Sequence, residues 1–398
     1  MQEEEPQDAL QPGLEEESKL VLTSIASSFF RLGLVAFGGP AAHISMMETE
    51  FVERRKLLRR EDYLDMVGAA NLIPGPNSTE TVMHVGYRLG GWTGLLVAGA
   101  SFILPAAVLT ALVAIAYVAG RDLNFMLPVL SGIQAAIIAL IGFAVWKLGK
   151  KAAKSNVLTA LAVLAGVFTA LGIPEVLVIL GAGALILIWS LARQSAAMAT
   201  PVMLWQAASL ITPEISASGV WREGVTAGSL FLTFLKTGAV LFGSGYVLVA
   251  YLEADLVDRL NWLTSEELLD AIAMGQFTPG PVLTTATFVG QLLGGFPGAV
   301  LATLGIFLPS FVFVALTAPI IPKLRKSNIA APFLDGANAG AVGVMASVLI
   351  SLSMENLTDP FRIALAIAAA ILLGRMPKLS PILLVVGAGM LGAVYGMF

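Results

Sequence analysis

Long apolar runs dominate the chain from about residue 23 to its end, and Gly, Pro or charged residues separate them. Several runs reach about 20 residues, the length of an α-helix that crosses roughly 30 Å of hydrocarbon. Such runs, repeated along one chain, are typical of helical proteins that cross a membrane many times. The pattern therefore predicts an all-α polytopic membrane protein in which the apolar segments themselves form the fold.

The second half of the chain repeats the first. Residues 29–79 align without a gap with residues 234–284, and after one deleted residue the alignment continues as far as Gly132 and Gly336. Shared apolar composition alone does not place Pro, Gly and acidic residues in register, so we interpret the match as a duplication. The predicted organisation is an acidic disordered tail at 1–22, a first transmembrane repeat at 23–192, a cytoplasmic linker at 193–227 and a second transmembrane repeat at 228–398.

The positions of the basic residues indicate that the second repeat is inverted. Lys and Arg favour the cytoplasmic side in short loops, and in the first half they gather at 54–60 and 147–154. The corresponding region of the second half, 253–267, is acidic instead. Five full spans per repeat satisfy these signs if each Pro-Gly-Pro segment, at about 64–88 and 269–292, enters and leaves on the same side as a re-entrant or broken helical hairpin. A cytoplasmic N-terminus is the alternative, and it would require an additional crossing or an outside basic loop. The predicted spans lie near 24–45, 92–118, 128–146, 156–172 and 174–191, and near 228–251, 297–320, 332–353, 360–374 and 380–397.

Each repeat carries a Pro-Gly-Pro turn inside its apolar region, at 74–76 and 279–281. Pro removes a backbone donor and Gly permits a positive φ, so each turn is predicted to end one half-helix and begin another. Hydrocarbon contains no water, so the unpaired N–H groups of the new helix need a partner, and its dipole favours an anion. Secondary transporters build midplane sites from inverted repeats with broken helices in this way. A polar surface turn is the plainer alternative, and breaks at 38–40 and 243–245 could equally serve close helix packing.

Arg31 and Lys236 occupy equivalent positions within apolar spans, where a charge costs at least ~2.5–3.5 kcal/mol on insertion scales. Two cations related by a pseudo-twofold axis suit one dianion. Alternatively, each side chain reaches the interface or pairs with an acidic neighbour such as Glu48 or Glu253. The predicted substrate-binding residues are Arg31, Gly38, Gly39, Pro40, Asn71, Pro74, Gly75, Pro76, Asn77, Ser78, Thr79, Lys236, Gly243, Ser244, Gly245, Gln276, Pro279, Gly280, Pro281, Thr284 and Thr285.

Glu80 and His84 lie four residues apart after the first turn and share a helical face. In a cavity of low dielectric constant, a carboxylate and an imidazole are candidates to carry a coupled proton. Their counterparts in the second repeat are hydroxyl or apolar residues, so such a role is asymmetric. A structural pairing of Glu80 with Arg88 or His84 is equally compatible. The candidate proton-coupling residues are Glu80, His84, His43, Glu48 and Glu253.

The composition excludes several classes of protein and of site. Only 13% of residues are charged, 57% are hydrophobic and the mean hydropathy is +0.84, which excludes an ordinary soluble domain. Cys is absent and two His are present, so we expect neither a thiolate nor a zinc site, and no cofactor. Most of the net charge of −4 comes from the first 20 residues, which show no signal-peptide pattern. A membrane-embedded enzyme using Glu80 and His84 is disfavoured because no nucleophile sits beside either His.

The motif series Phe37-Gly38-Gly39-Pro40, Pro74-Gly75-Pro76, Phe242-Gly243-Ser244-Gly245 and Pro279-Gly280-Pro281 resembles the chromate ion transporter family in its long, two-domain form. The resemblance covers about residues 25–398. It implies export of chromate from the bacterial cytoplasm across the inner membrane, driven by the membrane potential or an ion gradient, and chromate resistance. Sulfate is a chemically similar tetrahedral dianion. The sequence departs from the pattern at Gly243-Ser244-Gly245, and Glu80 places an acid beside the predicted anion site.

The expected partners are chromate or sulfate and the lipid bilayer, with no nucleic acid. A second copy of the chain is a further candidate, because spacings such as Gly387 to Gly392 support close helix packing within or between chains. Two alternatives keep the fold and change the activity: an uncoupled anion channel, and a transporter of another oxyanion such as sulfate. A purely structural scaffold is disfavoured by the charges placed within apolar spans.

Overall fold

The computed structural model describes residues 12–36, 39–120, 123, 126–194, 221–242, 245–320, 330–376 and 379–397. These residues form helices and connecting turns and contain no β-strand. The first repeat contains α1 (Pro12–Val35), α2 (Gly39–Met47), the π-helix η1 (Glu48–Arg54), α3 (Arg60–Ala70), α4 (Asn77–Gly120), α5 (Met126–Ala152), α6 (Asn156–Ala170) and α7 (Glu175–Gln194). The second contains α8 (Ala227–Val240), η2 (Gly245–Val247), α9 (Leu248–Leu252), the π-helix η3 (Glu253–Arg259), α10 (Ser265–Phe277), η4 (Val282–Thr284), α11 (Thr285–Thr317), η5 (Ala318–Ile320), α13 (Ala330–Asn356), α14 (Pro360–Arg375) and α15 (Pro381–Tyr395).

The duplication is visible in small backbone details. The π-helices η1 and η3 occupy equivalent positions, and each is followed by a non-glycine residue with φ of 52°, Lys56 in one repeat and Asn261 in the other. Local capping fixes several helix starts, as where the Thr264 side chain accepts from the Glu267 N–H and Glu267 returns the bond. The same chain path is therefore built twice from different side chains.

Each long helix α4 and α11 is in fact a hairpin. Gly91 has φ of 59° and ψ of −148°, and Gly295 has 57° and −152°, so both helices break there. A Cβ placed on Gly86 would lie 2.4 Å from the carbonyl oxygen of Gly94. Eight residues of straight helix extend about 12 Å, so this contact requires that the chain reverses. Residues 77–89 therefore form a short helix that packs back against the span beginning at residue 92, where the predicted span also begins.

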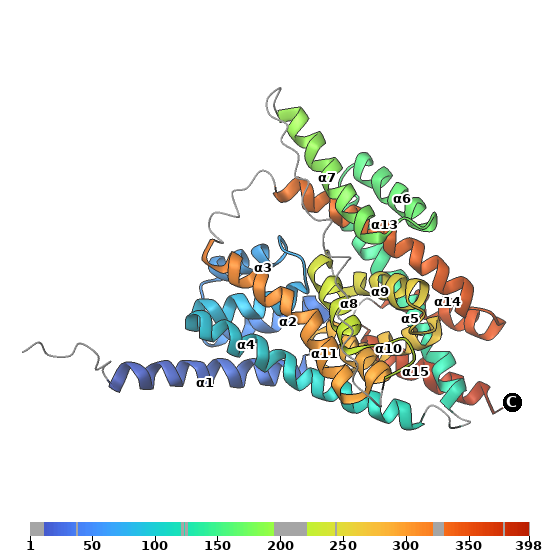
Figure 1. The fold of residues 1–398 in the computed structure, drawn as a ribbon, viewed down its shortest axis with the longest axis horizontal. Coiled ribbons are helices and arrows are strands. Elements are labelled where there is room, and N and C mark those ends of the chain that lie inside the picture. The colour runs from blue at the N-terminus through green and yellow to red at the C-terminus, as the bar shows by residue number, and fades with distance from the viewer. Residues whose placement is uncertain are drawn as a thin grey trace, which may run out of the picture.

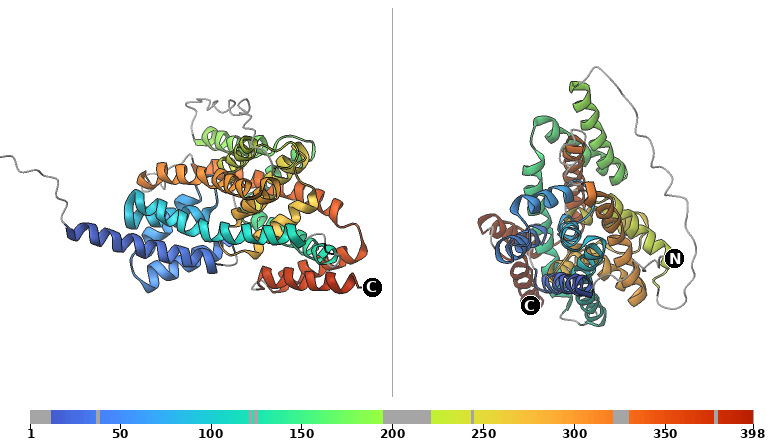
Figure 2. Two further views of the ribbon diagram at one scale, coloured as in Figure 1. Left: turned by 60° about the horizontal axis from the view of Figure 1, so that its bottom comes forward. Right: turned by 90° about the vertical axis from the view of Figure 1, so that its left-hand side faces the viewer.

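The two repeats exchange their last helices. Within each repeat the first helix packs on the hairpin, α1 on α4 (Figure 2) and α8 on α11, and the hairpins α4 and α11 pack on each other. In contrast, α13 packs on α6 and α7 of the first repeat, while α5 packs on α14 and α15 of the second (Figure 1). Small residues permit these approaches, since Gly132 meets the Ala388 carbonyl and Gly343 meets the Ala162 carbonyl. The sequence repeats are consequently not separate units in space.

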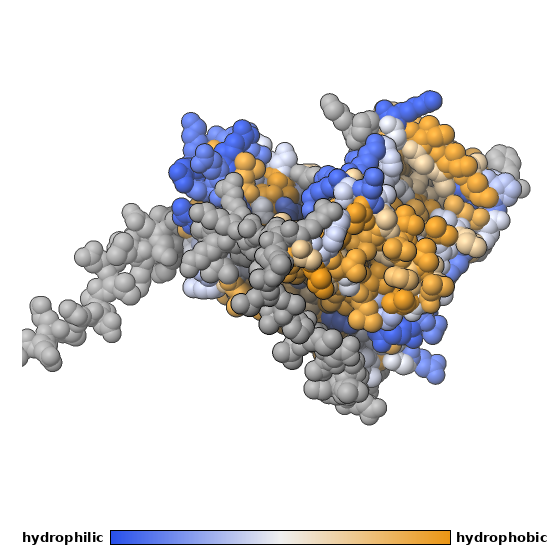
Figure 3. All heavy atoms as spheres, turned by 90° about the horizontal axis from the view of Figure 1, so that it is seen from above, coloured by the Kyte–Doolittle hydropathy of each residue, from blue (hydrophilic) through white to orange (hydrophobic). Residues whose placement is uncertain are grey.

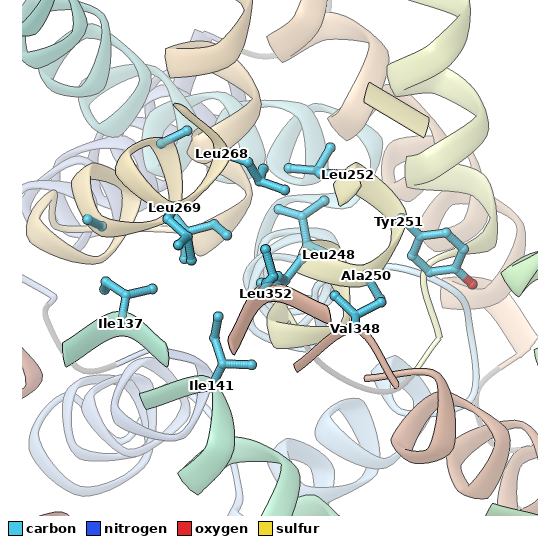
Figure 4. Close-up of a cluster of buried hydrophobic side chains, with 14 of the residues drawn as sticks. Ile137, Ile141, Leu248, Ala250, Tyr251, Leu252, Leu268, Leu269, Val348 and Leu352 are labelled. Carbon is cyan, nitrogen blue, oxygen red and sulfur yellow. The ribbon is translucent and has the colours of Figure 1, made fainter. Parts of the chain in front are cut away.

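The core and the surface are both apolar. Buried side chains from α5, α9, α10 and α13 meet in one cluster that includes Ile137, Leu248, Leu268 and Leu352 (Figure 4). Large hydrophobic side chains are also exposed on the outside, for example Leu96, Leu104 and Val108 of α4. On the face seen from above, hydrophobic residues form a continuous area bordered by hydrophilic residues (Figure 3). An apolar exterior of this extent suits contact with lipid.

Among the described residues, five helical segments are long and apolar enough to cross a membrane: Asn77–Gly120, Met126–Ala152, Glu175–Ala192, Val282–Thr317 and Ala331–Asn356. Four shorter apolar helices coincide with further predicted spans: Leu22–Val35, Asn156–Ala170, Ala227–Val240 and Pro381–Tyr395. Helix α14 covers the remaining predicted span near 360–374. The protein is a multi-pass membrane protein.

The segment predicted to be a disordered tail is partly helical, because α1 begins at Pro12. Residues 14–22 are mostly strong helix formers and extend the following apolar helix. Residues 1–11, and residues 195–220 of the predicted linker, lie outside the described residues.

The hairpin predicts that adding one methyl group lowers the stability of the protein at some glycines and not at others. Gly86→Ala inserts a Cβ against the Gly94 carbonyl and should cost about 1–3 kcal/mol of stability through overpacking. Gly68→Ala, in α3, meets nothing within 4 Å and should stay within about 0.5 kcal/mol of the parent. Thermal unfolding of both purified variants in detergent compares them, and equal melting temperatures would contradict the reversal at Gly90 and Gly91.

Candidate functional site

Each Pro-Gly-Pro turn hydrogen-bonds to the broken helix of the other repeat. The Gly75 N–H donates to the Leu241 carbonyl at 2.7 Å, and the Gly280 N–H donates to the Ala36 carbonyl at 2.9 Å. Ala36 aligns with Leu241, and Gly75 aligns with Gly280. The two bonds are therefore equivalent under a pseudo-twofold relation, and they bring both turns and both helix breaks to one place in the fold.

Both turns require glycine. Gly75 has φ of +133° and Gly280 has φ of +96°, a region that side-chain-bearing residues rarely adopt. A Cβ on Gly75 would meet the Glu80 carboxylate and the Ser310 hydroxyl, whereas a Cβ on Gly280 would meet the methyl group of Ala106. Ser310 and Ala106 are themselves equivalent in the two repeats, so the same contact is polar at the first turn and apolar at the second.

A chain of hydrogen bonds connects the two turns through His43 of α2. The His43 Nε2 lies 3.2 Å from the Ala36 carbonyl, the group that also accepts from Gly280. A carbonyl only accepts, so we assign the ring proton to Nε2, and Nδ1 then accepts from the Ser78 hydroxyl at 3.2 Å. Ser78 stands in the first turn of α4, so this chain ties the start of that helix to the turn of the opposite repeat.

Four buried polar side chains at the first turn have no hydrogen-bond partner among the described residues. They are Thr79, Glu80, His84 and Ser310, with residue exposures of 0%, 0%, 1% and 0%. The first three belong to α4, and Ser310 comes from α11 of the other repeat. Buried polar groups are normally hydrogen-bonded, so a cluster of unpartnered atoms indicates a place where a ligand completes the bonds. We refer to these four residues as the open cluster.

The second turn satisfies its own hydroxyls. Thr284 Oγ1 donates to the Pro281 carbonyl and Thr285 Oγ1 to the Val282 carbonyl, each at 2.9 Å, while Thr110 donates to Thr278 at 3.1 Å. The counterparts of His43 and Ser78 are Leu248 and Leu283. The backbone is thus symmetric around the two turns and the side chains are not.

A second buried carboxylate lies in α10 and was missed as a candidate in the sequence. Asp270 accepts from the Tyr117 hydroxyl at 2.7 Å and from the Gln134 amide at 2.9 Å, and it is 3% exposed. The repeat alignment points to this residue, because Asp270 aligns with another acidic residue, Asp65. Ser310 was also missed, because nothing in a sequence links it to a turn more than 200 residues away.

The two predicted cations lie outside the open cluster. Arg31 is exposed on α1, and Lys236, 43% exposed at its side chain, pairs with Asp255 at 2.7 Å. Asp255 also pairs with Arg259 at 2.9 Å. The placement of Lys236 matches the alternative in which the cation pairs with an acidic neighbour.

The other predicted residues are distributed around the turns and the helix ends. Gly39, Pro74, Gly75, Pro76, Gly245, Pro279, Gly280 and Pro281 lie in the turns and breaks, Asn77 donates to Asn71, and Pro40 and Gln276 are half-buried. Gly38, Gly243 and Ser244 lie outside the described residues. Glu48 pairs with Arg60 at 2.6 Å, and Glu253 accepts from Ser265 at 3.2 Å. Burial, with Asp258 and Glu355 nearby, raises the pKa of Glu253 to about 7. No group of three potential metal ligands occurs among the described residues.

A helical membrane protein with broken helices that meet at a buried polar centre between two repeats has the construction of a transporter. The chain belongs to the chromate transporter family, whose model matches it twice, at residues 23–187 and 228–393. A "Chromate transport protein" of Cupriavidus metallidurans is 32% identical over 380 residues, covering 94% of this chain and 93% of the relative. One of Pseudomonas aeruginosa with the same description is 30% identical over 384 residues, covering 92% and 90%. No solved structure matches the chain.

A shorter relative matches only part of the chain. An uncharacterized transporter of Bacillus subtilis is 31% identical over 132 residues, which cover 72% of that protein and 32% of this one. That length is less than one repeat, in agreement with the two separate matches of the family model.

The link between His43 and Ser78 predicts non-additive stability. His43→Leu leaves the Ser78 hydroxyl without an acceptor and should cost about 1–3 kcal/mol, as should Ser78→Ala, which leaves the ring nitrogen unpaired. The double variant should cost less than the two single variants together, by about 0.5–3 kcal/mol, since the second repeat tolerates apolar residues at both positions. Thermal unfolding of the four proteins measures this cycle, and strict additivity would show that the two side chains do not interact.

Proposed function

We propose that this protein is a secondary transporter that exports chromate across the bacterial inner membrane and so confers chromate resistance. The observation that carries the proposal is the open cluster at the first Pro-Gly-Pro turn, where buried polar groups lack partners. The relatives described as chromate transport proteins support chromate as the substrate. Chromate is a tetrahedral oxyanion and accepts hydrogen bonds at all four oxygens.

The anion binds, in this proposal, at the start of α4. Helix residues 77–89 begin directly after the turn, and a helix N-terminus favours an anion through its N–H groups and its dipole. Thr79 and Ser310 supply hydroxyl donors, and Ser78 stands beside them, bonded to His43. The second turn, with Pro279 to Thr285, frames the site from the opposite repeat through the Gly280 bond to Ala36.

The proposed topology places the two repeats in opposite orientations. The exchanged bonds of Gly75 and Gly280 are what a twofold axis through the site produces, and an axis in the membrane plane relates inverted repeats. The short helices that precede Gly90 and Gly294 then form re-entrant hairpins with α3 and α10, so that each turn reaches the site from one side of the membrane.

Arg31 and Lys236 act at a distance in this proposal. Both lie at exposed, equivalent positions one to two turns before the helix break, where positive charge raises the local concentration of an anion. They draw chromate toward the site and do not hold it. Glu48, His43 and Glu253 stay candidates for binding a coupled ion.

Coupled transport is favoured over an open channel because the polar atoms of the open cluster are sealed from solvent. A closed site fits a protein that exposes its substrate to one side at a time. Sulfate, with the same shape and charge as chromate, is the alternative substrate.

Uptake of labelled chromate into inverted membrane vesicles tests the proposal. We expect saturable uptake that depends on the membrane potential or an ion gradient and is reduced by excess sulfate. Gly75→Ala should lower the rate at least tenfold, because it strains the turn and pushes on Glu80 and Ser310, while Gly68→Ala should transport at the parental rate.

Each failure has a distinct meaning. Uptake that never exceeds the equilibrium set by the potential would identify a channel. Uptake of sulfate but not of chromate would reassign the substrate. Parental transport by Gly75→Ala would remove the first turn from the site.

A further inference from the structure

We propose that Glu80 binds the oxyanion as the neutral acid, so that one proton enters the site with each oxyanion. The inference rests on the proposed function and deepens it, because it states what else must occupy the same site. It begins from the two carboxylate oxygens of Glu80, which are both buried and both without a hydrogen-bond partner among the described residues.

The surroundings of Glu80 provide nothing that neutralises a negative charge. Its carboxyl group is fully buried with the Ser310 hydroxyl of α11 close to it, and no ion pair joins it to a charged side chain of the described residues. In the part of the chain that the structure describes, no Lys or Arg is buried. An ionised carboxylate here would be a buried charge without a partner, which proteins avoid.

Binding of a dianion makes an ionised Glu80 still less favourable. Were Glu80 ionised, three negative charges would meet in a sealed site where like charges repel strongly. A protonated carboxyl group instead carries an O–H that can donate a hydrogen bond. The Glu80 carboxyl group lies beside Gly75, Thr79 and Ser310, at the start of α4. The acid then contributes a hydrogen bond to an oxygen of the anion in place of repelling it.

The second repeat supports this assignment by comparison. Thr285 occupies the position equivalent to Glu80 and is a neutral hydroxyl whose hydrogen is already donated to Val282. The first repeat therefore has an ionisable side chain, Glu80, where the second repeat has a neutral one. His84, one helical turn later, is the other titratable group of the open cluster, and its two ring nitrogens are unpartnered as well.

Two consequences follow from a proton that binds with the anion. The affinity for chromate weakens as pH rises through the titration of Glu80, by at most about tenfold per pH unit for one proton. Each exported dianion also carries one positive charge with it, so the net charge moved per chromate is −1 in place of −2.

The test measures chromate binding to the purified full-length protein between pH 6 and pH 9, with Glu80→Gln as the matched variant. Gln keeps the shape and a donor of the neutral acid but has no proton to lose. Both proteins meet the same mixture of chromate species, so the difference between their pH slopes isolates the proton of Glu80. We expect the parent to lose affinity more steeply than Glu80→Gln, and we expect His84→Gln to keep the parental slope.

Proton uptake on binding gives a second readout on the unaltered protein. In weakly buffered solution, at a pH above the titration of Glu80 in the free protein, chromate should draw up to about one more proton per site into the parent than into Glu80→Gln. Equal slopes and equal proton uptake in the two proteins would overturn the inference and leave the transport function standing. Absence of chromate binding by the parent at every pH would overturn the proposed function, and the inference with it.

Discussion

A backbone N–H or C=O inside hydrocarbon must be paired, and this constraint decides how the two repeats meet. Each repeat breaks a helix at its beginning and interrupts another at a Pro-Gly-Pro turn, so both expose groups that the same repeat does not pair. The exchanged bonds from Gly75 to Leu241 and from Gly280 to Ala36 pair them across the pseudo-twofold. The turn glycines Gly75 and Gly280, with their positive φ, and the close approach of α4 and α11 are arranged around these two bonds.

Much of this arrangement could be predicted from the chain. The duplication, the breaks at the Pro-Gly-Pro turns and the start of the span at residue 92 follow from Pro and Gly, whose conformational effects are local. The exchange of α5 and α13 between repeats could not be predicted, because apolar helices of similar length have no local mark of their partner. Ser310 and Gly75 likewise meet only through tertiary packing, in this case that of α11 against α4.

The side chains show where the two copies have diverged. His43, Ser78, Glu80 and Ser310 in or beside the first turn correspond to Leu248, Leu283, Thr285 and Ala106 around the second. Polar replacement at one turn leaves buried atoms to be satisfied by something else, while apolar and self-bonded residues at the other turn rigidify the frame. In a duplicated backbone, the residues of one turn can thus stabilise the fold while those of the other turn bind a ligand.

The exchange of helices also constrains how such a protein can be assembled. Because α13 completes the packing of α6 and α7, and α14 and α15 complete that of α5, neither half of the chain encloses its own core. A chain that carried a single copy of the repeat would have to borrow these helices from a second molecule, giving an interlaced pair of subunits. When both copies lie in one polypeptide, each repeat always packs against the other repeat of the same chain. The side chains of one copy can then change independently of those of the other.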